Sequence, residues 1–141
     1  MTPEEEKALL LRVVLRVAQS QLERSGFAPF GATLGGARDV QLLIPESAKS
    51  GTMTVDVVDA YWRKQMGKAL EAGNVRALCT VADVRETDGE GKLVPGVFVH
   101  LEHSTGDAED LLYFYAKLEG ARVTFQEPFR DKAALQFFTA T

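Results

Sequence analysis

From Val75 to Phe125 the chain reads as a series of short apolar stretches separated by turns, and these stretches are apolar at both odd and even positions. Successive side chains of a strand point to opposite faces of its sheet, so a strand with one face in water would alternate apolar and polar residues. The pattern therefore predicts a sheet whose two faces both need cover. In the stretch 75–84 the apolar residues of one parity are Val75, Ala77, Cys79 and Val81, and those of the other are Leu78, Ala82 and Val84. In the stretch 110–118 those of one parity are Leu112, Phe114, Ala116 and Leu118, and those of the other are Leu111, Tyr113 and Tyr115.

Two other stretches carry apolar residues at helical spacing. The first begins with a Thr-x-x-Glu capping box, formed by Thr2 and Glu5, and is expected to end near Gly26. The second is expected from about Val55 to Ala72, where Gly73-Asn74 would end it. Two helices offer little cover for a sheet that is apolar on both faces. The apolar surface left over would suit a protein partner.

Short loops join the apolar stretches after the second helix, which requires neighbouring strands to pair antiparallel. We therefore expect one α+β domain spanning 1–141, with a single antiparallel sheet of five or six strands and the two main helices packed on one face. The tail Phe129–Thr141 could form one further short helix. The expected strands are Phe30–Leu34, Val40–Ile44, Val75–Arg85, Val97–His103, Asp110–Leu118 and Arg122–Phe125.

Charge and cysteine content narrow the choice of partners and compartment. The net charge is −4, and the 16 basic residues are interleaved with 20 acidic ones, which argues against a nucleic-acid surface. The single cysteine, Cys79, lies in the middle of an apolar stretch and is expected to be a buried, inert thiol in a reducing compartment. The acidic N-terminus differs from a secretory signal, and no apolar run reaches membrane-spanning length. We therefore expect a soluble, cytoplasmic protein with no nucleic-acid or membrane partner.

The densest polar cluster is His100, Glu102 and His103. On a strand His100 and Glu102 share a face, while His103 points to the opposite one. A zinc site needs three or four good ligands, and the chain has two histidines and one cysteine. We interpret His100 and Glu102 as polar positions near the solvated end of a strand, with a metal site as the minor alternative. No catalytic, metal-binding or cofactor-binding residue is predicted.

The segment Phe27–Leu34 follows the first helix and reads F-A-P-F-G-A-T-L. In it Pro29 is expected to direct the chain out of the helix, and Gly31 to let a backbone or a ring pack closely. The segment resembles one found in a family of small uncharacterised bacterial proteins, which is also similar to this chain at 77–84 and at 97–103. That resemblance implies a bacterial protein of this fold and brings no catalytic residues with it.

The order of helices and strands also resembles that of roadblock and longin domains, which serve as dimerising scaffolds and regulators. Depending on register, the second face of the sheet would be apolar, and a patch of that size suits a homodimer or a protein partner. The alternative is internal, because the aromatic tail could fold back and cover the face. The residues named as a possible interface are Phe98, Tyr113, Tyr115, Phe137 and Phe138.

The sequence favours a protein-interaction or dimerising module without enzymatic activity. It does not by itself exclude an enzyme. Two further classes stay open. One is an immunity or inhibitor protein directed against a bacterial toxin. The other is a small-molecule-binding domain with a pocket between the second helix and the sheet, which would need convergent polar groups in an apolar cleft.

Overall fold

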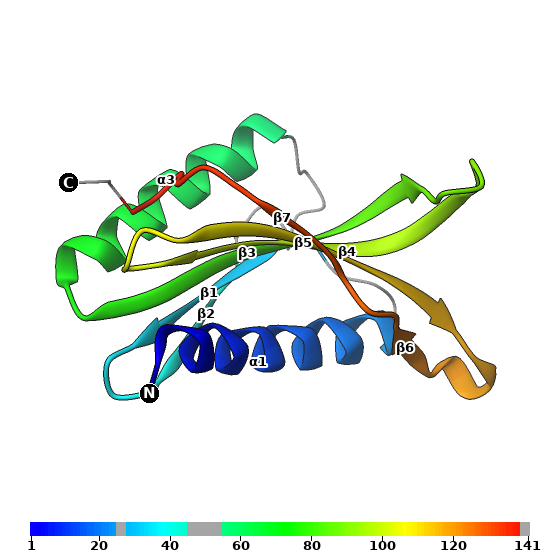
Figure 1. The fold of residues 1–141 in the computed structure, drawn as a ribbon, viewed down its shortest axis with the longest axis horizontal. Helices are drawn as coiled ribbons and strands as arrows, with labels where there is room; N and C mark the ends of the chain where they lie inside the picture. Colours follow the sequence, from blue (N-terminus) through cyan, green and yellow to red (C-terminus); the bar gives the residue numbers. More distant parts are fainter. Residues whose placement is uncertain (25–27, 45–54, 139–141) are drawn as a thin grey trace.

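The computed structural model describes residues 1–24, 28–44 and 55–138, which form one antiparallel sheet and two long helices (Figure 1). The expected ends of the first helix at Gly26 and of the second strand at Ile44–Pro45 therefore lie partly outside the described residues. The elements are α1 (Pro3–Arg24), β1 (Phe30–Gly35), β2 (Val40–Leu43), α3 (Val55–Ala72), β3 (Val75–Thr87), β4 (Leu93–His103), β5 (Ala108–Lys117), η1 (Glu119–Ala121), β6 (Val123–Phe125) and β7 (Phe129–Lys132).

The sheet has the strand order β2-β1-β3-β4-β5-β6, and β7 also pairs with β5. All pairs are antiparallel, which confirms the expected α+β class and the expected pairing. Strands β6 and β7 share the outer edge of β5, because β6 pairs with Tyr115–Lys117 and β7 with Glu109–Leu112. The tail that was expected to form a short helix instead begins with β7 and continues as irregular backbone to Phe138.

The two helices cover opposite faces of the sheet, whereas the sequence led us to expect both on one face. Helix α1 packs against the face that carries Cys79, and α3 packs against the face that carries Leu78. Adjacent residues of a strand point to opposite faces, so the two helices lie on either side, below and above the sheet in Figure 1. Each face of the sheet is thus covered by one helix, and the helices cover only part of each face.

The start of α1 follows the expected capping box. The backbone N–H of Glu5 donates to Oγ1 of Thr2 (3.1 Å), and the N–H of Thr2 donates to the Glu5 carboxylate (3.3 Å). One turn on, the buried Glu6 carboxylate accepts from Arg76 of β3 (3.0 Å) and lies 3.0 Å from Nε2 of His103 on β4. These bonds join the start of α1 to the sheet, and they confirm that His103 points away from the face of His100 and Glu102.

Helix α3 comes unusually close to β1 at Gly31. A Cβ atom at this position would lie 2.9 Å from Cζ3 of Trp62 and 3.1 Å from Cε of Met66. The close approach confirms the expectation that Gly31 admits a ring, and it seats Trp62 and Met66 on Leu78 of β3. This cluster of Trp62, Met66 and Leu78 lies directly beside the candidate site, because Trp62 also lines it.

Candidate functional site

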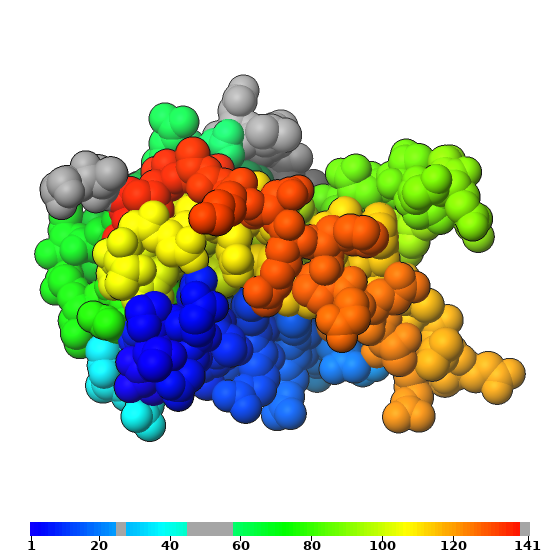
Figure 2. Space-filling model, viewed as in Figure 1, coloured from blue at the N-terminus to red at the C-terminus, as the bar shows by residue number. Residues whose placement is uncertain are grey.

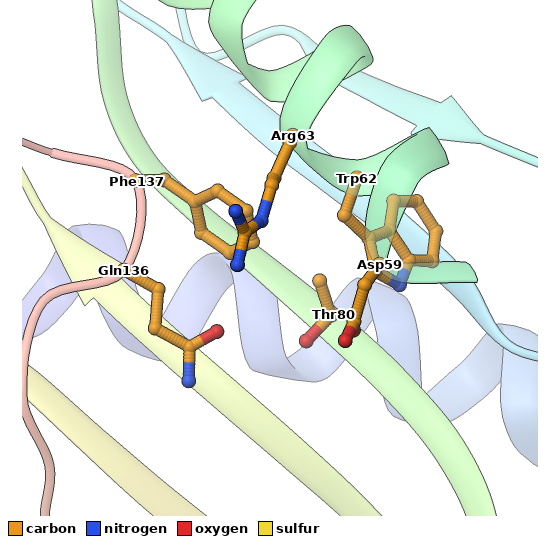
Figure 3. Close-up of a pocket in the computed structure, with 6 residues that line it drawn as sticks. All are labelled: Asp59, Trp62, Arg63, Thr80, Gln136 and Phe137. Carbon is orange, nitrogen blue, oxygen red and sulfur yellow. The ribbon is translucent and has the colours of Figure 1, made fainter. Parts of the chain in front are cut away.

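A cavity of about 700 Å³ lies between α3, β3 and the C-terminal segment Ala133–Phe138 (Figure 3). Its volume lies within the range of about 300–1,000 Å³ that is common for small-molecule pockets. The lining side chains come from three elements that are far apart in the sequence. They are Asp59, Trp62 and Arg63 of α3, Thr80 of β3, and Gln136 and Phe137 of the C-terminal segment.

The aromatic walls of the cavity are set by the core beneath them. Trp62 is 5% exposed and belongs to a cluster with Met66 and Leu78, both fully buried. Phe137 packs against the same cluster from the C-terminal side. Thr80 stands between Gly31 of β1 and His100 of β4 in the sheet register. The cavity therefore has an aromatic ring on two of its sides and a hydroxyl group on its floor.

Two unlike charges stand on α3 beside this cavity. Asp59 and Arg63 are one helical turn apart and exposed. Residues at this spacing often form an ion pair on a helix surface. Within the described residues neither of them makes one. In Figure 3 the Arg63 guanidinium extends in the direction of Phe137, and the Asp59 carboxylate in the direction of Thr80. Both charges are therefore available to a ligand in the space between them.

Behind the cavity floor lies a buried polar chain. Nδ1 of His100 is 2.7 Å from Oδ1 of Asp110 on β5, and Nε2 of His100 is 2.6 Å from Oε2 of Glu102. The His100 and Glu102 side chains are 3% and 0% exposed. The pair therefore belongs to the interior, not to the solvated strand end at which the sequence suggested it would lie. The shared face that the spacing predicted for His100 and Glu102 is confirmed.

The Glu102 carboxylate also holds the C-terminal segment. Its Oε2 atom accepts the backbone N–H of Gln136 (2.6 Å), and its Oε1 atom accepts those of Phe137 (3.1 Å) and Phe138 (3.0 Å). Consecutive backbone N–H groups that converge in this way form an anion-binding nest. The backbone of the cavity wall that carries Gln136 and Phe137 is thus hydrogen-bonded to the sheet through a single side chain.

The protonation of this buried pair follows from its hydrogen bonds. Burial alone lowers the pKa of His100, but the hydrogen bonds with Glu102 and Asp110 outweigh burial and raise that pKa above its ordinary value. Burial alone raises the pKa of Glu102, but the hydrogen bonds from His100 and from the three backbone N–H groups outweigh it, and the pKa is lowered. The raised pKa favours the imidazolium form of His100, in which each ring nitrogen donates to a neighbouring carboxyl oxygen, one of Asp110 and one of Glu102.

The residues named as a possible interface fall into three environments. Tyr113 and Tyr115 lie in the core under α1, 7% and 5% exposed, because their pairing register turns them to that face. Phe137 and Phe138 pack against the α3 cluster, as the alternative of a folded-back tail required. Phe98 lies on the α3 face and is partly exposed. The tyrosine rings therefore offer little surface to a partner.

Sequence reasoning missed most of the cavity. In the sequence Arg63 is followed by a second cation, Lys64, and Asp110 belongs to an acidic stretch, and neither pattern indicates a binding site. The spacing of Asp59 and Arg63 on either side of Trp62 is a local signal that could have drawn attention to α3. Gln136 carries no such signal, because its role depends on where the tail folds.

Comparisons of this chain with protein-family models, with curated proteins and with solved structures find no match. The resemblances drawn from the sequence therefore stay predictions. Across the described part of the chain, neither α1 nor α3 is long and apolar enough to cross a membrane. Over the same residues, no group of three or more His, Cys, Asp or Glu side chains is arranged to hold a metal ion.

Proposed function

We propose that this protein is a small-molecule-binding domain, and that the cavity beside α3 takes a small zwitterion with a flat apolar portion. The observation that carries the proposal is the set of side chains at the cavity, in which a carboxylate and a guanidinium stand beside two aromatic rings. Arg63 would pair with the carboxylate of the ligand and Asp59 with its ammonium group. Trp62 and Phe137 would enclose the apolar portion.

Binding without chemistry fits this cavity better than catalysis. An enzyme of the acid–base type needs a titrating group within hydrogen-bond reach of its substrate. His100 is 3% exposed and both of its ring nitrogens are engaged by carboxylates, so it supports the structure behind the floor. Among the lining residues, Thr80 has a hydroxyl group but no basic side chain hydrogen-bonded to it. These features support a binding role.

Trp62 supplies the assay, since it is the single tryptophan of the chain and it lines the cavity. We would titrate the protein with L-phenylalanine, with phenylpropionate, which lacks the ammonium group, and with phenethylamine, which lacks the carboxylate. The expected result is a saturable change in tryptophan emission with L-phenylalanine, and binding about tenfold weaker for the other two, from the loss of one charged hydrogen bond.

Variants assign this binding to the cavity. Asp59→Asn should abolish the preference over phenylpropionate, and Arg63→Gln the preference over phenethylamine. Lys64→Gln is the matched control, because Lys64 is an exposed cation next to Arg63 and does not line the cavity. Emission that does not change with any of the three compounds would contradict the proposal, as would equal affinity for all three.

A second candidate function, self-association, is favoured by one observation. On the α3 face, Phe98 and Leu112 are partly exposed, and Phe129, which pairs with Leu112 in register, is 63% exposed. A second copy of the chain could cover this patch. We expect a dimer by light scattering at about 100 µM, lost in Phe129→Ser and retained in Leu118→Ser, which removes another largely exposed apolar side chain outside the patch. A monomeric wild-type protein would refute this candidate.

A further inference from the structure

We propose that Ala133–Phe138 is a movable wall of the cavity, and that Glu102 is the positioning residue that holds this wall in its binding position. The inference rests on the proposed function, because it concerns access to the same cavity. Two lining side chains, Gln136 and Phe137, belong to this segment. Figure 2 shows the segment (red) at the molecular surface against the β4 and β5 region (yellow).

The attachment of the wall is concentrated on one carboxylate. The N–H of Ala133 donates to the carbonyl of Ala108 (3.0 Å), which continues the pairing of β7 with β5. Beyond Ala133, the hydrogen bonds that the described segment makes with the sheet all end at Glu102. Loss of this carboxylate would therefore leave the wall without polar attachment over the residues that line the cavity.

The other sides of the cavity are held differently. Trp62 lies in the buried cluster of α3, and Thr80 lies on a strand with hydrogen-bonded neighbours on both sides. In the wall no side chain is fully buried: Ala134 and Gln136 are exposed, and Phe137 is partly exposed. Segments with few buried apolar contacts open at a lower free-energy cost than a core strand or helix. Phe137 and Phe138 do pack on the α3 cluster, but only partly buried, so the C-terminal wall is the side that opens at the lowest cost.

The network behind Glu102 fixes the direction of its carboxylate. His100 donates to Oε2, and Asp110 accepts from the other ring nitrogen of His100. The same Oε2 atom accepts the N–H of Gln136. A ligand that contacts Phe137 and Gln136 gains these contacts only when the segment is attached. Ligand binding and attachment should therefore stabilise each other, since the two equilibria are linked.

Two matched variants distinguish the loss of the hydrogen bonds between Glu102 and the C-terminal segment from the loss of any carboxylate bonded to His100. Glu102→Gln puts an amide NH₂ group among donors and should release the segment. Asp110→Asn also replaces a carboxylate that bonds to His100, but the described backbone N–H groups of the segment donate to Glu102 and not to Asp110. In hydrogen exchange of the unliganded protein, we expect protection of the C-terminal amides to fall by about tenfold or more in Glu102→Gln. Protection in Asp110→Asn should stay closer to that of the wild type.

Circular dichroism would show whether Glu102→Gln folds. If it does not fold, a third variant still tests the inference. Gln136→Pro removes one backbone donor to Glu102 (2.6 Å) and leaves the buried His100–Glu102 pair intact. It should raise exchange of the remaining C-terminal amides and weaken the binding of L-phenylalanine measured by Trp62 emission.

The outcomes distinguish this inference from the proposed function. If none of the three probes binds the wild type, the proposed function fails, while the exchange data still report on the attachment. If C-terminal exchange is the same in wild type, Glu102→Gln and Gln136→Pro, the attachment is refuted whatever the probes do. If exchange rises but the affinity for L-phenylalanine is unchanged, the segment is held by Glu102 but is not a wall of the binding site, and the inference is overturned.

Discussion

The substitution Gly31→Ala tests the close approach of α3 to β1, on which the cavity stands. The new Cβ atom would lie 2.9 Å from Cζ3 of Trp62, 3.0 Å from the carbonyl oxygen of Cys79 and 3.1 Å from Cε of Met66. The Met66 side chain is flexible and can move. The Cys79 carbonyl belongs to the backbone of β3, and Trp62 is 5% exposed and enclosed, so neither can yield without displacing its neighbours.

Overpacking of this kind costs about 1–3 kcal/mol. Alanine also restricts the unfolded chain relative to glycine, which offsets about 0.4–1 kcal/mol. We therefore expect Gly31→Ala to lower the free energy of unfolding by about 1–2 kcal/mol. Because the methyl group presses on the indole ring, the emission of Trp62 in the folded state should shift as well. Urea unfolding followed by circular dichroism and by tryptophan emission measures both effects.

Gly67→Ala, on α3, is the control substitution. A Cβ atom at Gly67 would meet nothing within 4 Å. Because alanine is the better helix former, this variant should be more stable than the wild type by about 0.5–1 kcal/mol. The two glycine substitutions should thus change stability in opposite directions. If Gly31→Ala is as stable as the wild type and leaves the emission of Trp62 unchanged, the described packing of α3 on β1 is refuted.

Three further predictions concern buried ionisable groups. Burial raises the pKa of the Cys79 thiol to about 12, so a thiol reagent should modify it only after unfolding, and rapid reaction of the folded protein would contradict this. The pKa of Glu102 is lowered in the folded protein, so Glu102 stabilises the fold above pH 4.5, its ordinary pKa, and this stabilisation is lost as pH falls through the folded-state pKa. The pKa of His100 is raised, so His100 stabilises the fold below pH 6.5, its ordinary pKa, and this stabilisation is lost as pH rises through the folded-state pKa. Hydrogen-exchange protection of the C-terminal segment should therefore be greatest in weakly acid solution, and a flat profile would refute the ionic attachment. Glu6→Gln should cost about 1.5–3 kcal/mol in urea unfolding because Glu6 is buried with charged partners, whereas Glu4→Gln, at an exposed carboxylate, should change stability by less than about 0.5 kcal/mol.

Local features of the fold could be predicted from the sequence, and long-range ones could not. The capping box of Thr2 and Glu5 involves residues three apart, and the strands β3, β4 and β5 show their own apolar patterns. The apolar residues of both parities correctly indicated that both faces need cover. Which face receives α3 is a matter of long-range packing on Leu78 of β3, and no local pattern reports it. The side taken by Tyr113 depends in the same way on its pairing with Val97 of β4.

The candidate site shows the same limit. The spacing of His100 and Glu102 predicted one shared face, but their burial depends on the tail and on the register that places Asp110 opposite His100. Every residue except proline carries a backbone N–H group, so the donors at Gln136–Phe138 leave no mark in the sequence. A site whose key contacts are backbone groups of a distant segment can be found only in the folded structure.

The choice of a charged anchor for the C-terminal segment is itself informative. Under α3, Trp62 and Met66 pack on Leu78 through apolar contacts, which need no polar partner. A buried carboxylate is an expensive alternative, because its desolvation must be offset by hydrogen bonds, and well-packed apolar side chains often give equal or greater stability. What the carboxylate provides instead is direction and reversibility, since its bonds fix the backbone of the segment in one geometry and are replaced by water when the segment leaves. A wall that only had to stay closed would not need Glu102, and this contrast with α3 is the physical reason to expect that the segment opens.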